Sequence, residues 1–247
     1  MTEIQDPQAL RRLIEHTALK PGTTPRDIIR LCREAEEYGF GAVCVPSSLV
    51  PLARNYLGEP DLDNPPVKLV TVAGFPLGNA STSAKAAEAV QALHDGADHV
   101  DMVIHLGRLL GGLEFGAHAG RSRLMRMVIE DIRDVRDAMK SLSPRAELKV
   151  IIETGHLDAD GICLACDAVE QGGAEWVKTS TGFGPRGASI EDVRLMRAAV
   201  EGRLRIKAAG GIRTLEEMHA FAAAGADALG CSAAPAVFQP LDLGAAA

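Results

Sequence analysis

The sequence predicts one α/β domain over residues 1–247, folded as a closed (β/α)8 TIM barrel. The main reason is an alternation. Eight short apolar segments are separated by stretches of helical periodicity, which is typical of an all-parallel sheet covered by helices. The length agrees, because such barrels usually need about 250 residues and the chain has 247. An open doubly wound sheet is the alternative, but its GxGxxG fingerprint is missing after the first predicted strand.

The eight predicted strands are short and consist mainly of Val, Ile, Leu and Ala, as in parallel strands that are buried under helices. Only 4% of the residues are aromatic, so aliphatic side chains must form most of the core. The first strand carries the weakest signal. In chain order the predicted strands are residues 13–17, 42–45, 69–72, 100–104, 148–152, 176–179, 204–208 and 226–230.

The segments between the strands carry helix signals. Thr24 and Pro25 have the form of a helix start, with a capping residue followed by proline at the first helical position. Thr214 and Glu217 have the spacing of a capping box. Several helical segments are followed by glycine, which can adopt a positive φ and end a helix. These glycines are Gly39, Gly96, Gly172 and Gly225.

The composition argues against several kinds of partner. The net charge is −7 and the basic residues are scattered, so we expect neither nucleic acid nor an acidic membrane surface to bind. No stretch of about 20 apolar residues is present, which argues against a membrane-spanning helix. The first residues lack the basic and apolar regions of a signal peptide, so we expect a cytoplasmic protein.

The five cysteines are not spaced as a disulfide framework, and we expect reduced thiols. Cys163 and Cys166 form a CxxC pair, but no second ligand pair for zinc accompanies it. The pair lies inside an apolar helical pattern. We therefore expect two small buried residues on a helix face rather than a zinc or redox site.

Two lysines occupy positions where a barrel places its chemistry, which is the C-terminal end of the strands. Lys178 and Lys207 each follow apolar residues near the end of a predicted strand. Burying a lysine there is costly unless something compensates for the lost hydration. The other lysines have simpler explanations. Lys68 and Lys149 start strands on the opposite face, and Lys85 and Lys140 lie on helical segments where water can solvate them.

Lys178 and Lys207 belong to neighbouring strands, so their side chains should lie within a few ångströms of each other. A second cation lowers the pKa of the first amine, which favours the free amine that imine formation needs. Asp101 interrupts an otherwise apolar strand and can pair with these lysines or move protons. The alternatives are that the lysines bind a phosphate or carboxylate, and that Asp101 forms a structural ion pair.

Three glycine-rich or hydroxyl-rich loops suit an anion. They follow predicted strands six, seven and eight, where barrels often hold a phosphate with backbone N–H groups and a helix N-terminus. Together they indicate a phosphorylated carbonyl substrate. The loops are residues 179–183, 209–214 and 230–232.

The segment from Val177 to Phe183 closely resembles the Schiff-base motif of the deoxyribose-phosphate aldolases. The resemblance extends over nearly the whole chain, and its motifs occur in the family's order. The other matching segments are residues 16–21, 43–45, 74–78, 100–104, 149–154 and 207–214.

This resemblance implies a lyase that reversibly joins acetaldehyde and glyceraldehyde 3-phosphate into 2-deoxyribose 5-phosphate, in nucleotide catabolism. Lys178 takes the position of the nucleophile, Lys207 that of the lysine that tunes it, and Asp101 that of the proton-handling carboxylate. No metal or organic cofactor is implied, and such barrels commonly form homodimers or larger homo-oligomers. The expected substrate and phosphate contacts are Thr17, Lys20, Cys44, Thr179, Gly182, Gly210, Gly211, Gly230 and Ser232.

The chain departs from the family pattern at several positions. Glu15 replaces an aspartate, His105 an asparagine and Ala209 a serine. Ala233 removes a hydroxyl from the turn after strand eight, and the tail lacks the terminal tyrosine of some members. The segment of residues 109–122 is about ten residues longer than the resemblance leads us to expect.

Three other functions stay open at this level. One is a lysine aldolase of the same fold that acts on other, unphosphorylated aldehydes. Another is a phosphosugar-binding barrel without catalysis. The third is a metal-dependent aldolase or epimerase, which His16, His105 and His156 could serve, although no metal-ligand spacing joins them.

Overall fold

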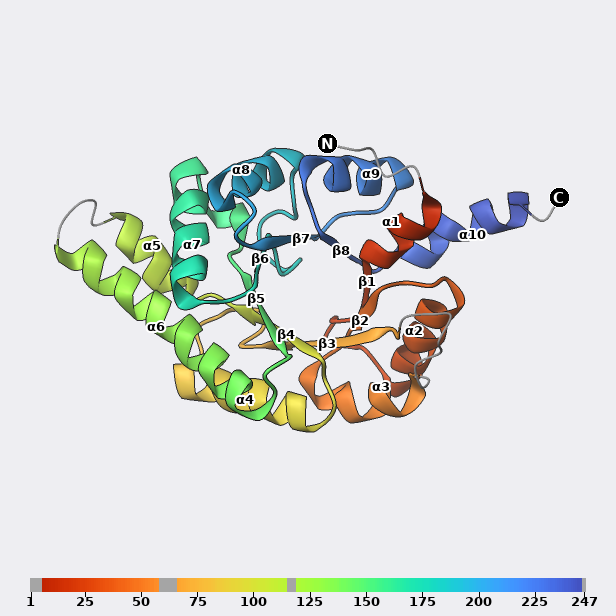
Figure 1. Ribbon diagram of the computed structural model, residues 1–247, viewed down its shortest axis with the longest axis horizontal. Coiled ribbons are helices and arrows are strands. Elements are labelled where there is room, and N and C mark those ends of the chain that lie inside the picture. The colour runs from red at the N-terminus through yellow and green to blue at the C-terminus, as the bar shows by residue number, and fades with distance from the viewer. Residues whose placement is uncertain (1–5, 58–65, 115–118, 246–247) are drawn as a thin grey trace.

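The computed structural model describes residues 6–57, 66–114 and 119–245. Within these ranges eight parallel strands form a closed barrel in chain order, and the first strand pairs with the last (Figure 1). The predicted fold class is confirmed. The strands are β1 (Ile14–Thr17), β2 (Ala42–Cys44), β3 (Lys68–Ala73), β4 (His99–Val103), β5 (Glu147–Ile151), β6 (Trp176–Lys178), β7 (Arg205–Ala209) and β8 (Ala228–Cys231).

Helices surround the barrel on its outside (Figure 1). The α-helices are α1 (Pro7–Leu13), α2 (Pro25–Glu37), α3 (Val50–Tyr56), α4 (Thr82–His94), α5 (Leu106–Glu114), α6 (Ala119–Leu142), α7 (Ala159–Gly172), α8 (Ile190–Val200), α9 (Leu215–Ala224) and α10 (Ala234–Ala245). Two short 3-10 helices, η1 (Ser47–Leu49) and η2 (Thr154–His156), follow β2 and β5.

Local sequence signals set several helix ends. Thr24 and Asp27 form a reciprocal capping box at the start of α2, with Pro25 at the first position. Thr214 and Glu217 do the same for α9, which ends at Gly225 with a φ of 108°. A residue with a side chain would be strained in that conformation.

The long segment after β4 forms the end of α5 and the start of α6. These two helices pack on each other and extend from the ring of helices at the left of Figure 1. Residues 115–118, in the middle of this segment, lie outside the described residues.

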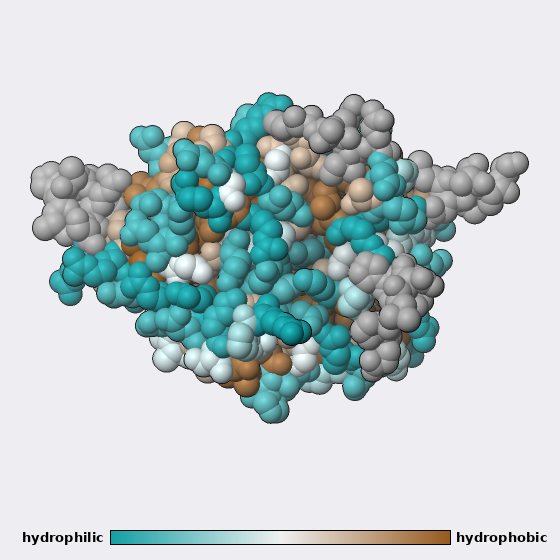
Figure 2. Space-filling model, viewed as in Figure 1, coloured by the Kyte–Doolittle hydropathy of each residue, from teal (hydrophilic) through white to brown (hydrophobic). Residues whose placement is uncertain are grey.

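The surface face in Figure 2 is mostly hydrophilic, with smaller apolar patches between polar residues. No helix in the described ranges is long and apolar enough to cross a membrane.

The barrel interior is divided into an apolar part and a charged part. Strands β2 and β3 contribute the apolar part, on which Leu19 and Phe75 pack; its buried members are Ala42, Cys44, Val70 and Val72. The charged part comes from β1 and from β4 to β7. It consists of Glu15, Asp101, Lys149, Lys178 and Lys207, all of which are buried.

Three side chains lie elsewhere than the sequence suggested. Lys149 is 1% exposed because β5 begins two residues before it, which carries this position into the barrel. Lys85 is also fully buried, because it pairs with Asp131 between α4 and α6. Of the CxxC pair, Cys166 is buried as expected, whereas Cys163 is exposed.

Candidate active site

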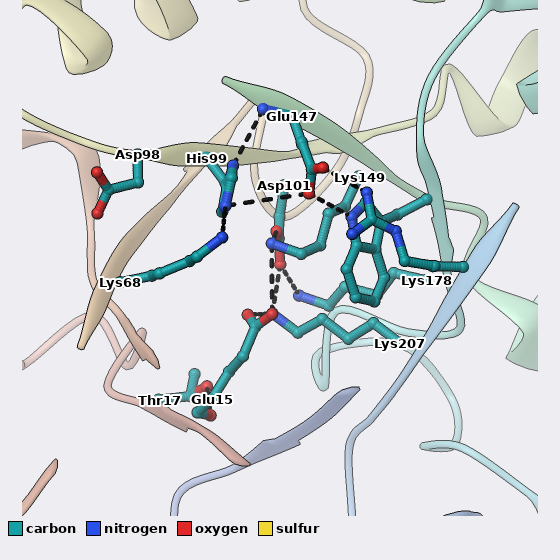
Figure 3. Close-up of polar contacts among 12 residues, drawn as sticks. Glu15, Thr17, Lys68, Asp98, His99, Asp101, Glu147, Lys149, Lys178 and Lys207 are labelled. Atoms are coloured by element: carbon teal, nitrogen blue, oxygen red, sulfur yellow. Dashed lines mark hydrogen bonds and ion pairs between the residues drawn. The ribbon is translucent and has the colours of Figure 1, made fainter. Parts of the chain in front are cut away.

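The five charged side chains inside the barrel form one cluster centred on Asp101 (Figure 3). Lys178 and Lys207 both donate to Oδ2 of Asp101, with N–O distances of 2.8 and 2.6 Å. Lys149 Nζ lies 3.3 Å from the other oxygen of Asp101 and 3.3 Å from Glu15. Lys207 also donates to Glu15. Because they share one acceptor oxygen, the amines of Lys178 and Lys207 are close neighbours, as the strand order predicted.

The cluster holds three lysines against two carboxylates, so it carries one excess positive charge when all five groups are ionised. The compensation is unequal. Lys149 and Lys207 each contact both carboxylates, whereas Lys178 contacts Asp101 alone. Lys178 is therefore the lysine whose conversion to the neutral amine leaves the other four charges paired.

The pKa values of three groups around Lys178 favour their ionised forms. Burial disfavours the carboxylate form of Asp101, yet Lys178, Lys207 and Lys149 together keep its pKa well below the usual range. Glu15 behaves in the same way, and its pKa is lowered by Lys149 and Lys207 despite burial. Burial would lower the pKa of Lys207, but Asp101 and Glu15 raise it above the usual lysine value. Both carboxylates and Lys207 are thus ionised at neutral pH.

A cavity of about 900 Å³ lies beside this cluster, and within the cluster only Lys178 lines it. Its wall comes from segments that follow β1, β6, β7 and β8, which is the face where barrels carry out chemistry. The predicted contacts that line the cavity are Thr17, Lys20, Gly182, Gly210, Gly211, Gly230 and Ser232. The structure therefore brings the nucleophile candidate and the three anion loops to the same cavity.

The backbone of these loops requires glycine. Gly182, Gly210 and Gly211 have φ values of 86°, 93° and 86°, which favour glycine over any residue with a side chain. A Cβ on Gly230 would lie 2.9 Å from the Cβ of Ala209. The turn after β8 leads directly into α10, whose N-terminus favours an anion.

Two predicted contacts are not in the cavity wall. The hydroxyl of Thr179 donates to Ala209 O at 3.2 Å and accepts from Ala209 N at 3.0 Å, so it joins β6 to β7. Cys44 lies inside the apolar part of the barrel, where burial raises the pKa of its thiol to about 11. The structure thus gives Thr179 a role in the scaffold and leaves Cys44 as a buried thiol.

Sequence reasoning missed two members of the cluster. From the sequence, Glu15 is only a departure from the family pattern and Lys149 is expected at the outer end of its strand, but both side chains are buried in the barrel. The signal for both was the alternation of side chains along a strand. Lys149 is the register partner of Asp101, and Glu15 is the register partner of Ala42, which lies in the barrel interior.

The three histidines considered as metal ligands do not gather. Among the residues that the structure describes, no group of three or more His, Cys, Asp or Glu side chains could hold a metal ion. His16 instead lines the cavity with both ring nitrogens near acceptor oxygens, Cys231 O and Glu34.

No protein-family model matches the chain. Curated relatives do match over almost their full length. The deoxyribose-phosphate aldolase of Thermococcus gammatolerans is 45% identical over 224 residues, which are 90% of this chain and 92% of that protein. The deoxyribose-phosphate aldolase of Thermus thermophilus is 44% identical over 225 residues, 91% of this chain and 93% of that protein.

Solved structures agree with these relatives. A putative deoxyribose-phosphate aldolase from Coccidioides immitis has a TM-score of 0.84 and 38% identity, covering 96% of this chain and 87% of that one. An aldolase named QR15 has a TM-score of 0.81 and 35% identity, covering 95% and 96%. With this identity over nearly the full length of the aldolases, the chain belongs to the deoxyribose-phosphate aldolase family.

Proposed function

We propose that this protein is a class I aldolase that reversibly cleaves 2-deoxy-D-ribose 5-phosphate to acetaldehyde and D-glyceraldehyde 3-phosphate, with Lys178 as the nucleophile. The observation that carries this proposal is the position of Lys178. It is the member of a buried charged cluster that faces the cavity, and it has one carboxylate partner where the other two lysines have two.

The cleavage direction begins with the neutral amine of Lys178, which attacks the C1 carbonyl of the open-chain sugar and loses water to form an imine. A base removes the proton of the C3 hydroxyl, the C2–C3 bond breaks, and its electron pair moves into the protonated imine to give an enamine. Glyceraldehyde 3-phosphate leaves. The enamine is protonated at C2, and hydrolysis of the resulting imine releases acetaldehyde and the free lysine.

Asp101 is suited to handle protons at the nitrogen of Lys178. Its Oδ2 atom lies 2.8 Å from that nitrogen, which is within direct transfer distance. Lys207 donates to the same oxygen and keeps the carboxylate oriented. The three groups can therefore exchange a proton while water is lost from the carbinolamine, with no rearrangement of the cluster.

The three glycine-rich loops are the proposed site for the 5-phosphate. Gly182, Gly210, Gly211, Gly230 and Ser232 surround the part of the cavity next to the N-terminus of α10, and backbone N–H groups there can bind phosphate oxygens. Lys20 lines the same cavity and adds positive charge.

We also propose that the 247 residues form one domain, that the enzyme acts in the cytoplasm on the sugar phosphate left by deoxynucleoside breakdown, and that it forms a homo-oligomer. Two observations support the homo-oligomer and the reducing compartment, respectively. The relative from Aeropyrum pernix, 30% identical with a TM-score of 0.81 over 97% of this chain and 94% of that one, is described as a tetramer. The five cysteines are free thiols.

The experiment that tests this proposal is cleavage of 2-deoxyribose 5-phosphate compared with unphosphorylated 2-deoxyribose. Acetaldehyde release is measured with a coupled alcohol dehydrogenase. We expect a higher kcat/KM for the phosphorylated sugar. Equal values would favour the aldolase for unphosphorylated aldehydes, and no release from either sugar would favour the non-catalytic binding protein.

A further inference from the structure

Glu153, which follows β5, is hydrogen-bonded to the loop after β6. Its two carboxyl oxygens accept from the backbone N–H of Thr181 at 3.3 and 3.2 Å, and the Thr181 hydroxyl donates to one of them. The same hydroxyl accepts from the backbone N–H of Phe183 at 3.0 Å. Glu153 is 4% exposed, whereas Gly182 and Phe183 are exposed. A buried carboxyl group thus fixes the backbone of an exposed loop.

The backbone of Glu153 is in an unusual conformation. Its φ of 53° and ψ of 63° lie in the left-handed region, which residues with a side chain rarely adopt. The chain after β6 also passes close to the side chain, because a Cβ on Gly184 would lie 2.8 Å from the carboxyl carbon of Glu153. Local strain of this kind persists where the surrounding contacts maintain it, and it is common at functional sites. Both features indicate that the loop specifies the position of this side chain.

The contacts of Glu153 leave one backbone donor of the loop for a ligand. Of the successive N–H groups of Thr181, Gly182 and Phe183, the first donates to Glu153 and the third to the Thr181 hydroxyl. The N–H of Gly182 has no acceptor among the residues that the structure describes. Gly182 lines the cavity and is one of the residues proposed to hold the phosphate. Glu153 and Thr181 therefore determine which N–H group of the loop stays free to bind a ligand.

The far end of the same segment supports the loop after β7. The backbone N–H of Ala188 donates to the carbonyl oxygen of Gly210 at 3.1 Å. Arg186 ties this end to the chain after β5, because it donates to the carbonyl oxygen of Thr154 at 3.2 Å. Glu153 and Thr154 thus hold the two ends of the segment between β6 and α8, and this segment in turn contacts the second of the three anion loops.

We propose that Glu153 is a positioning residue for phosphate binding, which fixes the loop after β6 so that the N–H of Gly182 stays available to the 5-phosphate. The effect on phosphate rests on the proposed function, whereas the hold on the loop is a property of the free enzyme. A purely structural role would lower stability without separating phosphorylated from unphosphorylated sugars.

Glu88 of α4 provides a matched control. Its carboxyl oxygens accept from the N–H of Gly74 at 2.9 Å and from the Ser47 hydroxyl at 2.7 Å, so it holds the turn after β3 but does not line the cavity. Glu153→Ala keeps a Cβ and therefore the same backbone strain, and it loses only the acceptors. Glu153→Gln keeps one acceptor oxygen and can donate to the Thr181 hydroxyl, so it should retain the loop.

Hydrogen exchange in the free enzyme tests the hold on the loop. In Glu153→Ala the amides of Thr181 and Phe183 should exchange about tenfold faster, because Thr181 loses its acceptor and the loop opens more often. Glu153→Gln and Glu88→Ala should leave the exchange of these two amides within about twofold. Unchanged exchange in Glu153→Ala would overturn the proposal, as would an equal acceleration in Glu88→Ala.

Kinetics of the same variants test the effect on phosphate. Glu153→Ala should raise KM for 2-deoxyribose 5-phosphate about tenfold, as for the loss of one hydrogen bond to a charged group. Removing a negative charge near the phosphate would by itself lower KM, so an increase identifies the lost position of the loop. We expect kcat and the KM for unphosphorylated 2-deoxyribose to stay within about twofold, and Glu153→Gln to restore most of the affinity for the phosphorylated sugar.

Equal weakening of both sugars, or a fall in kcat alone, would overturn the phosphate role of Glu153. Failure of the proposed function gives a different result, because the unaltered enzyme would then show no preference for the phosphorylated sugar. In that case hydrogen exchange would still decide whether Glu153 holds the loop.

Discussion

Two buried groups of lysines and carboxylates can be compared within this molecule. Outside the barrel, Lys85 of α4 pairs with Asp131 of α6 at 2.8 Å, and both side chains are fully buried. Inside the barrel, Lys149, Lys178 and Lys207 share Glu15 and Asp101. The outer pair has equal numbers of each charge and is closed to water. The inner cluster has one cation too many, and its least compensated lysine opens into the cavity.

The outer pair shows what a structural ion pair needs. Lys85 also donates to Val103 O at 2.9 Å, and Thr82 donates to the second oxygen of Asp131 at 2.7 Å. Burial lowers the pKa of Lys85, partly offset by Asp131. Every polar atom of the pair has a partner, so nothing is left over for a ligand. Burial of a lysine alone is therefore a poor sign of catalysis. An excess of cations beside a cavity is a better one.

Replacing Lys178 should lower kcat more than any other substitution in the two groups. Lys178→Leu removes the proposed imine-forming nitrogen, and kcat should fall by at least about a thousandfold, because loss of a covalent nucleophile costs several orders of magnitude. Steady-state cleavage of 2-deoxyribose 5-phosphate measures this. A variant that kept more than about a tenth of the kcat, a barrier change of roughly 1.4 kcal/mol, would contradict the assignment.

Replacing Lys85 should change stability and leave catalysis in place. Lys85→Met leaves Asp131 buried without its cation. Removal of one partner of a buried ion pair lowers the free energy of unfolding by about 3–5 kcal/mol. The double variant Lys85→Met/Asp131→Leu should recover much of this loss. Chemical denaturation gives the free energies of unfolding, and kcat is measured where each variant is folded. A fall in kcat as large as that of Lys178→Leu would remove the distinction between the two groups.

Asp101→Asn tests whether the shared carboxylate transfers protons or only balances charge. The amide keeps the shape but removes a negative charge and a proton acceptor. We expect kcat to fall about a hundredfold, within the usual range for loss of a general acid–base group. Melting temperature and kcat are measured together. An unchanged kcat would show that Asp101 only balances charge, as Asp131 does in the outer pair.

Lys207 should remain charged throughout the pH range of the activity assay. Its pKa in the folded protein is raised by Asp101 and Glu15 despite burial. Its contribution to stability is therefore complete below the unfolded value of about pH 10.4 and is lost only as the pH rises through the folded value. Lys207→Met removes a cation beside the nucleophilic amine, which makes protonation of that amine easier. The limb on which kcat/KM rises with pH should therefore move to higher pH. A profile that falls equally at every pH would contradict this electrostatic role.

The smallest expected effect is at Ala233, where the turn after β8 lacks a hydroxyl. Ala233 lines the cavity next to Ser232, so Ala233→Ser adds a donor for the phosphate. One charge-assisted hydrogen bond should lower KM for 2-deoxyribose 5-phosphate about tenfold and leave unphosphorylated 2-deoxyribose unchanged. Equal KM values for the phosphorylated sugar in both enzymes would show that this turn does not limit phosphate binding.

The fold and the centre of the site could be predicted from local patterns. The alternation of apolar and helical segments gave the barrel. The strand order then made neighbours of Lys178 and Lys207, which the register confirms. Asp101 was recognisable because it interrupts an apolar strand. Each of these inferences uses only positions close in sequence or the regular order of strands.

The remaining features depend on contacts between distant parts of the chain. Lys85 looked solvated because its partner, Asp131, is 46 positions away on another helix. Lys149 looked external because its strand begins earlier than its apolar run, and Thr179 looked free because its bonding partners are on β7. A pattern along the chain contains no information about the partners of Lys85 and Thr179, whereas the alternation of side chains along β5 does place Lys149 inside the barrel.

The site at which an imine forms tests most directly whether Lys178 is the nucleophile. The enzyme is incubated with acetaldehyde and reduced with borohydride, and the modified residue is identified by digestion and mass spectrometry. We expect a single ethyl group on Lys178, with none on Lys149 or Lys207, because Lys178 alone of the three faces the cavity. An ethyl group on Lys207 or Lys149, or an active enzyme that traps none, would contradict it.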